Sequence, residues 1–212
     1  MRARLVSVQV GVPRIVKIEG DEVATGIFKS PVAKRVALRA MNLEGDRQAD
    51  LSVHGGRDKA VYAYPSEHYA YWKKQLQGVE LPWGAFGENF TTAGLLEDTV
   101  CLGDRFAIGT AEVVVTQPRI PCFKLNLKFN SDVMAKHFLA SRRSGFYFRV
   151  LREGEVGAKD KIALVHHDEN NVSVADALRI YLGDPDAREI LPRALRVEYL
   201  SAAWREEFQA LT

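Results

Sequence analysis

Residues 111–125 have the sequence AEVVVTQPRIPCFKL, which joins the end of a buried strand to a loop built around two prolines. Three consecutive valines favour a β-strand, because branched side chains pack well on a pleated surface. Pro118 and Pro121 then fix the backbone φ angle and remove two amide donors. Cys122 follows Pro121 directly. The stretch therefore predicts a strand that carries a thiol onto a stiffened loop.

On both sides of this stretch the chain has the pattern of β structure. Short segments rich in β-branched and aromatic residues are separated by Gly, Pro or Asp. No regular alternation of strands and helices indicates a doubly wound sheet. The spacing and the glycine punctuation favour a closed or partly closed barrel. The predicted strands cover residues 4–10, 61–64, 105–109, 111–116, 145–151 and 161–167.

Helical patterns interrupt this region twice and then dominate the end of the chain. Residues 65–77 and 131–143 predict single helices within the β region. After Asn170 three short helices follow one another. The sequence thus predicts a mainly β fold with some α structure: a barrel-like domain over residues 1–170 and a small three-helix domain over residues 171–212. Because so few residues make a small core, we expect the second domain to lean on the first or on a partner chain.

Composition excludes several classes of protein. The 212 residues carry a net charge of +2, too little to indicate nucleic acid or a membrane surface. The basic residues are not interleaved with aromatic ones, which also disfavours nucleic acid. No apolar run approaches the roughly 20 residues of a membrane span. The alternating N-terminal residues predict a first strand rather than a signal peptide, so we expect a cytoplasmic protein that is mature from residue 1.

The two cysteines predict different roles. Cys101 has a strand-like setting and the pattern of a small buried hydrophobe. Cys122 lies between Arg119 and Lys124, whose charges would lower the pKa of its thiol and favour the thiolate that attacks or binds metal. The alternative for Cys122 is a structural cysteine beside unrelated surface cations.

Three further loops concentrate polar groups. Residues 42–64 bring acidic and basic side chains to a Gly-Gly turn, where backbone amides can approach an anion. Residues 29–31 (Lys-Ser-Pro) place an ammonium and a hydroxyl on an ordered turn. Glycines bracket Glu88 and Asn89 on a third loop, where the amide of Asn89 can both donate and accept hydrogen bonds. Each of these has an ordinary solvated loop as its alternative, and His166 and His167, without a third ligand nearby, are interpreted as structural.

Taken in order, these stretches resemble the MOSC domain, named after the C-terminus of molybdenum cofactor sulfurase. The resemblance rests on TGIFKSPV, GDRQADLSVHGGRDKAVYAY, GENFTTAGL, GDRF and TQPRIPCFKL. It is strongest to the bacterial YiiM-like branch, which carries a C-terminal three-helix domain, and covers nearly the whole chain. It implies a β-barrel-like fold that holds a molybdenum cofactor of the molybdopterin type.

The resemblance also implies a site. Cys122 matches the family cysteine that binds molybdenum, and a soft thiolate suits that metal. His54, with Asp50 to orient it, would bind the cofactor or relay a proton, so Cys122, His54 and Asp50 form the candidate catalytic set. The predicted contacts to the phosphate and the pterin are Lys29, Ser30, His54, Gly55, Gly56, Asn89 and Arg119.

Related MOSC enzymes reduce N-hydroxylated compounds, such as N-hydroxylated bases and amidoximes, to amines. The same reaction here would need an external electron-donor reductase, because two cysteines cannot hold a four-thiolate iron–sulfur cluster. The sequence leaves two alternatives open. One is cofactor or sulfur delivery through Cys122, and the other is a thiol hydrolase or transferase with His54 as base. The oligomeric state also stays open, with a homodimer through the three-helix segment as one arrangement.

Overall fold

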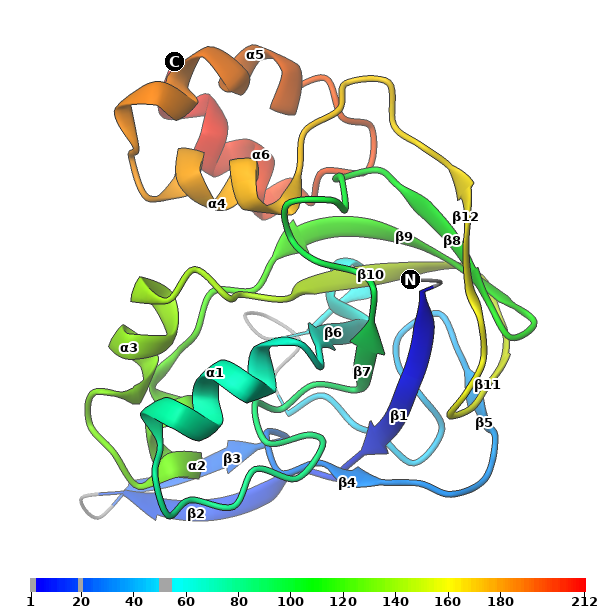
Figure 1. Cartoon of the computed structure of the whole chain (residues 1–212), viewed down its shortest axis with the longest axis vertical. Coiled ribbons are helices and arrows are strands. Elements are labelled where there is room, and N and C mark those ends of the chain that lie inside the picture. The colour runs from blue at the N-terminus through cyan, green and yellow to red at the C-terminus, as the bar shows by residue number, and fades with distance from the viewer. Residues whose placement is uncertain (1–2, 19–20, 50–54) are drawn as a thin grey trace.

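A computed structural model describes residues 3–18, 21–49 and 55–212 of the chain (Figure 1). An eight-stranded mixed sheet dominates it, in the order β12-β8-β9-β10-β6-β7-β1-β4. All neighbouring strands are antiparallel except β6 and β7. The strands are β1 (Arg4–Val10), β4 (Ser30–Pro31), β6 (Val61–Pro65), β7 (Phe90–Ala93), β8 (Arg105–Ile108), β9 (Ala111–Pro118), β10 (Phe146–Arg152) and β12 (Ile162–His166).

The sheet curls back toward itself without closing completely. β1 and β12 lie at or near opposite ends of the strand order, yet a single bridge joins Arg4 to Lys161. Backbone hydrogen bonds from Leu5 to Asp160 (2.8 Å) and from Ile162 to Ala3 (3.0 Å) flank it. No continuous ladder joins these two strands in the described residues. The predicted fold class, mainly β with helices and barrel-like, is therefore confirmed in that loose sense.

Before the C-terminal segment, the described residues also form two small two-stranded sheets, a 3-10 turn and three helices. Two-stranded pairs join β2 (Arg14–Ile18) to β3 (Asp21–Thr25) and β5 (Val36–Leu38) to β11 (Gly154–Val156). A 3-10 turn, η1 (Arg57–Lys59), precedes β6. The helices α1 (His68–Gln75), α2 (Phe123–Phe129) and α3 (Met134–Ala140) gather on one side of the molecule, away from the C-terminal helices (Figure 1).

α2 is a helix where the sequence predicted only a stiffened loop. Its sequence, FKLNLKF, alternates with a period of two and carries no helical signature. The helix forms because Leu125, fully buried, and Phe129, four residues later, both pack into an aromatic cluster around Trp72 and Phe86. It ends at Asn130, whose left-handed φ of 48° suits an αL cap.

The C-terminal segment forms α4 (Val174–Tyr181), the 3-10 turn η2 (Pro185–Ile190), α5 (Leu191–Ala194) and α6 (Ala202–Gln209). Ser173 starts α4 with a reciprocal capping box to Asp176. The three-helix character of this segment matches the prediction, whereas the domain boundary near Asn170 stays a prediction.

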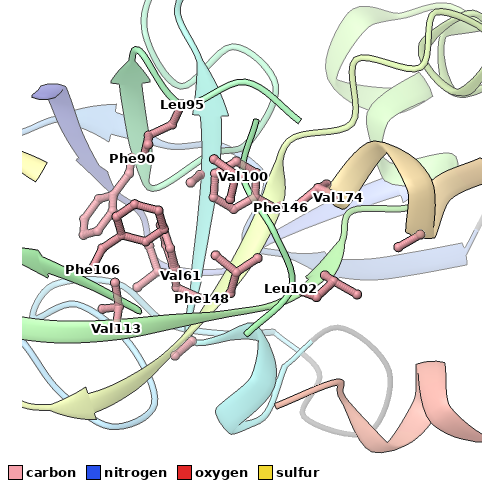
Figure 2. Close-up of a cluster of buried hydrophobic side chains, with 14 of the residues drawn as sticks. Val61, Phe90, Leu95, Val100, Leu102, Phe106, Val113, Phe146, Phe148 and Val174 are labelled. Atoms are coloured by element: carbon pink, nitrogen blue, oxygen red, sulfur yellow. The ribbon is translucent and has the colours of Figure 1, made fainter. Parts of the chain in front are cut away.

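One hydrophobic core runs through the sheet and the C-terminal helices. Val174 from α4 lies in the same cluster as Leu102, Val113 and Phe148 (Figure 2). The backbone makes the same connection, because the amide of Val174 donates to Val100 at 2.8 Å. The C-terminal helices therefore complete the core of the sheet. In the part of the chain that the structure describes, no helix is long and apolar enough to cross a bilayer.

Candidate functional site

A pocket of about 120 Å³ opens beside the end of β9. It combines segments that are distant in the sequence. This is because β9, β10 and β6 are neighbours in the sheet and have ends that lie close together. Most residues of the segments 25–29, 46–49, 59–62, 86–89 and 119–124 line it, together with Tyr147 from β10.

Cys122 reaches this pocket from the connection between β9 and α2. The last residue of β9, Pro118, pairs with Phe146 at the start of β10, and the amide of Arg119 donates to Gly145 at 3.2 Å. Three residues later Cys122 has an extended backbone (φ −128°, ψ 175°) and precedes the first turn of α2. Its thiol is half-buried and lines the pocket. The sheet before Cys122 and the helix after it thus fix the backbone that carries the thiol.

Arg119 places a buried cation next to this thiol. Its side chain is only 5% exposed and lies over the rings of Tyr62 (5.1 Å) and Phe138 (4.8 Å). Burial lowers the pKa of Arg119, but the phenols of Tyr62 and Tyr147 and the Cys122 thiol, when ionised, raise it, and the net shift is upward. The Nη1 atom of Arg119 has no hydrogen-bond partner among the described residues. A buried guanidinium with an unused donor is prepared to bind an anion.

Lys29 is held in the same pocket by Asp46. The two side chains form a buried ion pair. Asp46 also accepts hydrogen bonds from the amide of Gly11 (2.8 Å) and from Nδ2 of Asn89 (2.9 Å). Burial lowers the pKa of Lys29, and Asp46 offsets part of that effect. Asp46 therefore fixes the position of an ammonium group that lines the pocket.

Asn89 links Asp46 to the neighbouring strands by hydrogen bonds. Its Oδ1 accepts the amide of Tyr62 at 3.1 Å, and its Nδ2 reaches both Asp46 and the carbonyl of Gln9 (3.3 Å). These bonds brace Asp46 against β1 and β6. A direct contact between Asn89 and a pterin stays a prediction.

The described lining of the pocket carries more positive than negative side chains. Its described lining contains five cationic side chains and one carboxylate, Asp46. Lys128, in the last turn of α2, adds a cation nearby: its Nζ donates to the carbonyls of Ile27 (2.9 Å) and Gly84 (2.5 Å). The cationic lining residues are Lys29, Arg47, Lys59, Arg119 and Lys124. Such a pocket attracts an anionic ligand.

The remaining predicted residues lie elsewhere or outside the described residues. Ser30 is exposed on β4 and lines a neighbouring hollow of about 410 Å³, which shares Lys29 with the pocket. Gly55 and Gly56 do not line the pocket, and the amide of Gly56 donates to Gln48 at 2.9 Å. Asp50 and His54 fall outside the described residues, so their predicted catalytic roles stay predictions.

Asp46, Tyr62 and Tyr147 are among the contributors that were not predicted as site residues. Asp46 belongs to the polar stretch before β6, and its density of charged groups was the available signal. Tyr62 and Tyr147 belong to strands whose alternation predicts only that some side chains point to one face. Their pairing across β6 and β10 brings the two rings to 5.3 Å beside Arg119.

The chain belongs to a known family. Residues 50–163 match the family model of the MOSC domain, and residues 172–211 match that of the YiiM-like, 3-alpha helix domain. The chain is therefore a member of the MOSC-domain family with a YiiM-like C-terminal domain, and the resemblance seen in the sequence motifs is confirmed.

Individual relatives support this assignment. The uncharacterized protein YflK of Bacillus subtilis is 42% identical over 98% of this chain and 93% of its own length. The crystal structure of YiiM from Geobacillus stearothermophilus superposes with a TM-score of 0.82 at 40% identity and covers 98% of both chains. A Gibberella moniliformis protein named reductase is 33% identical over 76% of this chain, which corresponds to 29% of that protein.

Proposed function

We propose that this chain binds a molybdopterin-type molybdenum cofactor in the Cys122 pocket and reduces N-hydroxylated compounds to amines. The MOSC family is associated with the molybdenum cofactor, which supports the first half of the proposal. The partial similarity to a fungal protein named reductase supports an oxidoreductase. N-hydroxylated bases and amidoximes are the substrate class that the family resemblance implies.

The observation that carries the proposal is that a thiol and a buried guanidinium with an unused Nη1 donor, those of Cys122 and Arg119, line the same pocket. A molybdopterin cofactor is anionic, with a phosphate and a dithiolene. The five cations and single carboxylate of the described lining fit such a group. The soft sulfur of Cys122 fits the metal. The residues present therefore fit the implied cofactor in both charge and ligand chemistry.

Within this proposal the pocket residues have distinct roles. Cys122 would be the protein ligand to molybdenum, held between β9 and α2. Arg119 and Lys124 would bind the anionic part of the cofactor, and Asp46 would keep Lys29 oriented toward it. When bound, the cofactor supplies the two-electron redox chemistry, and the protein supplies binding and electrostatics.

The overall reaction is balanced by an external donor. The N–O bond of the hydroxylamine breaks, two electrons and two protons are consumed, and an amine and one water are released. We propose that a separate reductase supplies the electrons. Cys122 must stay reduced to act as a ligand, which agrees with the expectation of a cytoplasmic protein.

The test is reduction of an N-hydroxylated base by protein purified from cells that make the cofactor, with a chemical or flavoprotein electron donor. We expect amine formation by the wild type and its loss in Cys122→Ser. Lys136→Met is the control, because Lys136 is exposed on α3 and lies outside the pocket, and it should keep the activity. Product is measured by chromatography, and circular dichroism checks the fold of both variants.

Two outcomes would overturn the proposal. Unchanged activity in Cys122→Ser would remove this thiol as the metal ligand. Cofactor bound stoichiometrically by the wild type, without reduction by any donor or substrate of this class, would favour cofactor delivery instead.

A further inference from the structure

Three side chains that could bind a metal lie where β8 begins and β12 ends. Cys101 and Asp104 precede β8, and His167 follows β12. The two strands are antiparallel, with His166 opposite Arg105, so the residues just beyond them meet in space. The thiol of Cys101, the carboxylate of Asp104 and the imidazole of His167 have ligand atoms that all lie within 4.8 Å of one another. None of the three lines the Cys122 pocket.

The geometry of this cluster is close to that of a zinc site. Nδ1 of His167 and Oδ1 of Asp104 are 2.8 Å apart. Zn²⁺ binds sulfur at about 2.3 Å and nitrogen or oxygen at about 2.0–2.2 Å, with tetrahedral geometry. Ligand atoms around it are then about 3–4 Å apart, so a small adjustment of the side chains would suffice. Three protein ligands would leave a fourth position for water.

The backbone already fixes two of the ligands. Asp104 is 2% exposed, and its carboxylate accepts the amides of Cys101 (2.9 Å) and Asp168 (3.1 Å). Cys101 is buried and bridges to Ser173, the cap of α4. His167 is the adjustable member, because its side chain is 49% exposed. Two buried ligands with one exposed ligand leave a workable entry path for a metal ion.

The charges around Cys101 favour a cation. The carboxylates of Asp104, Asp176 and Asp168 act electrostatically on its thiol, and Arg193 opposes them. The same carboxylates would stabilise a divalent cation, which in turn would convert the thiol to a thiolate ligand. The mixed sulfur, nitrogen and oxygen set suits Zn²⁺ better than Mg²⁺ or Ca²⁺.

We propose that Cys101, Asp104 and His167 bind one Zn²⁺ ion, which ties the ends of β8 and β12 to the connection that leads into α4. The ion would link the sheet to the C-terminal helices, and its fourth position would be taken by water. The proposal is independent of the molybdenum cofactor, because it concerns the other cysteine.

The test is Zn²⁺ and Co²⁺ binding to the full chain in the Cys122→Ser background, where Cys101 is the only thiol. Titration should give one equivalent of bound Zn²⁺ and a rise in the melting temperature. Co²⁺ should give the near-ultraviolet absorption of a thiolate ligand. His167→Ala should weaken zinc binding by roughly tenfold or more. His166→Ala, an exposed neighbour on β12, is the matched control and should bind as the parent does.

Several results would overturn the inference. Equal Zn²⁺ affinity in the two histidine variants would assign the ion to an adventitious surface site. Co²⁺ binding without thiolate absorption would exclude Cys101. Because His167 is half exposed, its variant should fold, and an unchanged circular dichroism spectrum without metal confirms that any loss of binding is local. Molybdenum content of His167→Ala, measured with Cys122 restored, should equal that of the wild type, which separates this site from the proposed catalytic one.

Discussion

Cys101 and Cys122 differ in the charges that surround their thiols. Cys122 shares its pocket with the cations Arg119 and Lys124. The thiol of Cys101 lies among carboxylates, Asp104 foremost, and burial raises its pKa to about 12. A cationic surrounding favours an anionic ligand and an acidic one favours a metal cation. The charged residues around each thiol therefore suit the two cysteines to different ligands.

Asp46 is the residue on which the arrangement of the pocket depends most directly. Asp46→Asn removes the negative charge and leaves the ammonium of Lys29 buried without its ion-pair partner. We expect the free energy of unfolding to fall by about 3–5 kcal/mol, the usual effect of breaking a buried pair. Urea unfolding of the purified variant measures it.

The matched control for Asp46→Asn is Glu153→Gln. Glu153 pairs with Arg39 on the surface, where the side chains are 48% and 59% exposed. Solvent screens such a pair, so the variant should lose less than about 1 kcal/mol. Equal losses in the two variants would show that the Asp46–Lys29 pair is not a buried structural unit.

Local chemistry in the sequence drew attention to Lys29, Arg119 and Cys122, the family resemblance assigned them to one site, and the structure brings these three to one pocket. The unusual combination of prolines, cations and a thiol was visible in consecutive residues. Asn89 was selected for its loop, but its hydrogen bonds run to Asp46 and to backbone groups. The hydrogen bond between Asn89 and Asp46 joins residues 43 positions apart, so it leaves no local pattern in the sequence.

At the scale of the elements, α2 connects Cys122 to the rest of the pocket wall. Lys128 in its last turn donates to Ile27, beyond β3, and to Gly84, before β7. One side chain thus fastens the helix to two loops that border both hollows. Displacement of α2 would move Cys122, which directly precedes it.

The pH dependence of stability should report on Lys128. Burial lowers the pKa of its ammonium from 10.5 to about 8 in the folded chain. Between these values the unfolded chain binds more protons, so the free energy of unfolding should rise with pH across this window. The contribution should be on the order of 2–3 kcal/mol. Comparing urea unfolding of wild type and Lys128→Met at pH 7.5 to 10, values chosen to span roughly that window, isolates it.

Lys136→Met provides the comparison for that measurement, because Lys136 is exposed on α3. It should keep the slope of the wild type, whereas Lys128→Met should flatten it. An unchanged slope in Lys128→Met would mean that its ammonium is solvated in the folded protein.

Elements differ in how well the sequence predicted them. β9 and β10 were predicted closely, because runs of branched and aromatic residues between turn signals are distinctive. α2 was missed, because its helical form follows from packing of Leu125 and Phe129 against residues far away in the sequence. The hairpin of β2 and β3 was also not predicted; it lies mostly outside the core and has a weak apolar pattern.

At the scale of the whole molecule, the sheet and the C-terminal helices share one core. Phe208 of α6 is fully buried in the cluster that also holds Phe146 and Val113. The last helices were predicted to have only a small core of their own. They bury their apolar side chains together with those of the sheet, as expected for so short a segment. We expect the described regions to unfold together.

Phe208→Ala tests this coupling. Removing a buried phenylalanine should lower the free energy of unfolding by about 3–5 kcal/mol while leaving a single transition. Leu211→Ala, nearby but 40% exposed, should cost less than about 1 kcal/mol. Near- and far-ultraviolet circular dichroism are recorded together. Separate transitions, with the helices melting first, would show that the C-terminal segment is an independent unit.

The central claim is that the Cys122 pocket holds the molybdenum cofactor, and metal and pterin content tests it most directly. Wild type and Cys122→Ser are purified from cells that make the cofactor, with a known molybdoenzyme prepared alongside to verify loading. We predict near-stoichiometric molybdenum and pterin in the wild type and their loss from the folded variant. Equal metal in both proteins, or none in the wild type when the known enzyme is loaded, would contradict the claim.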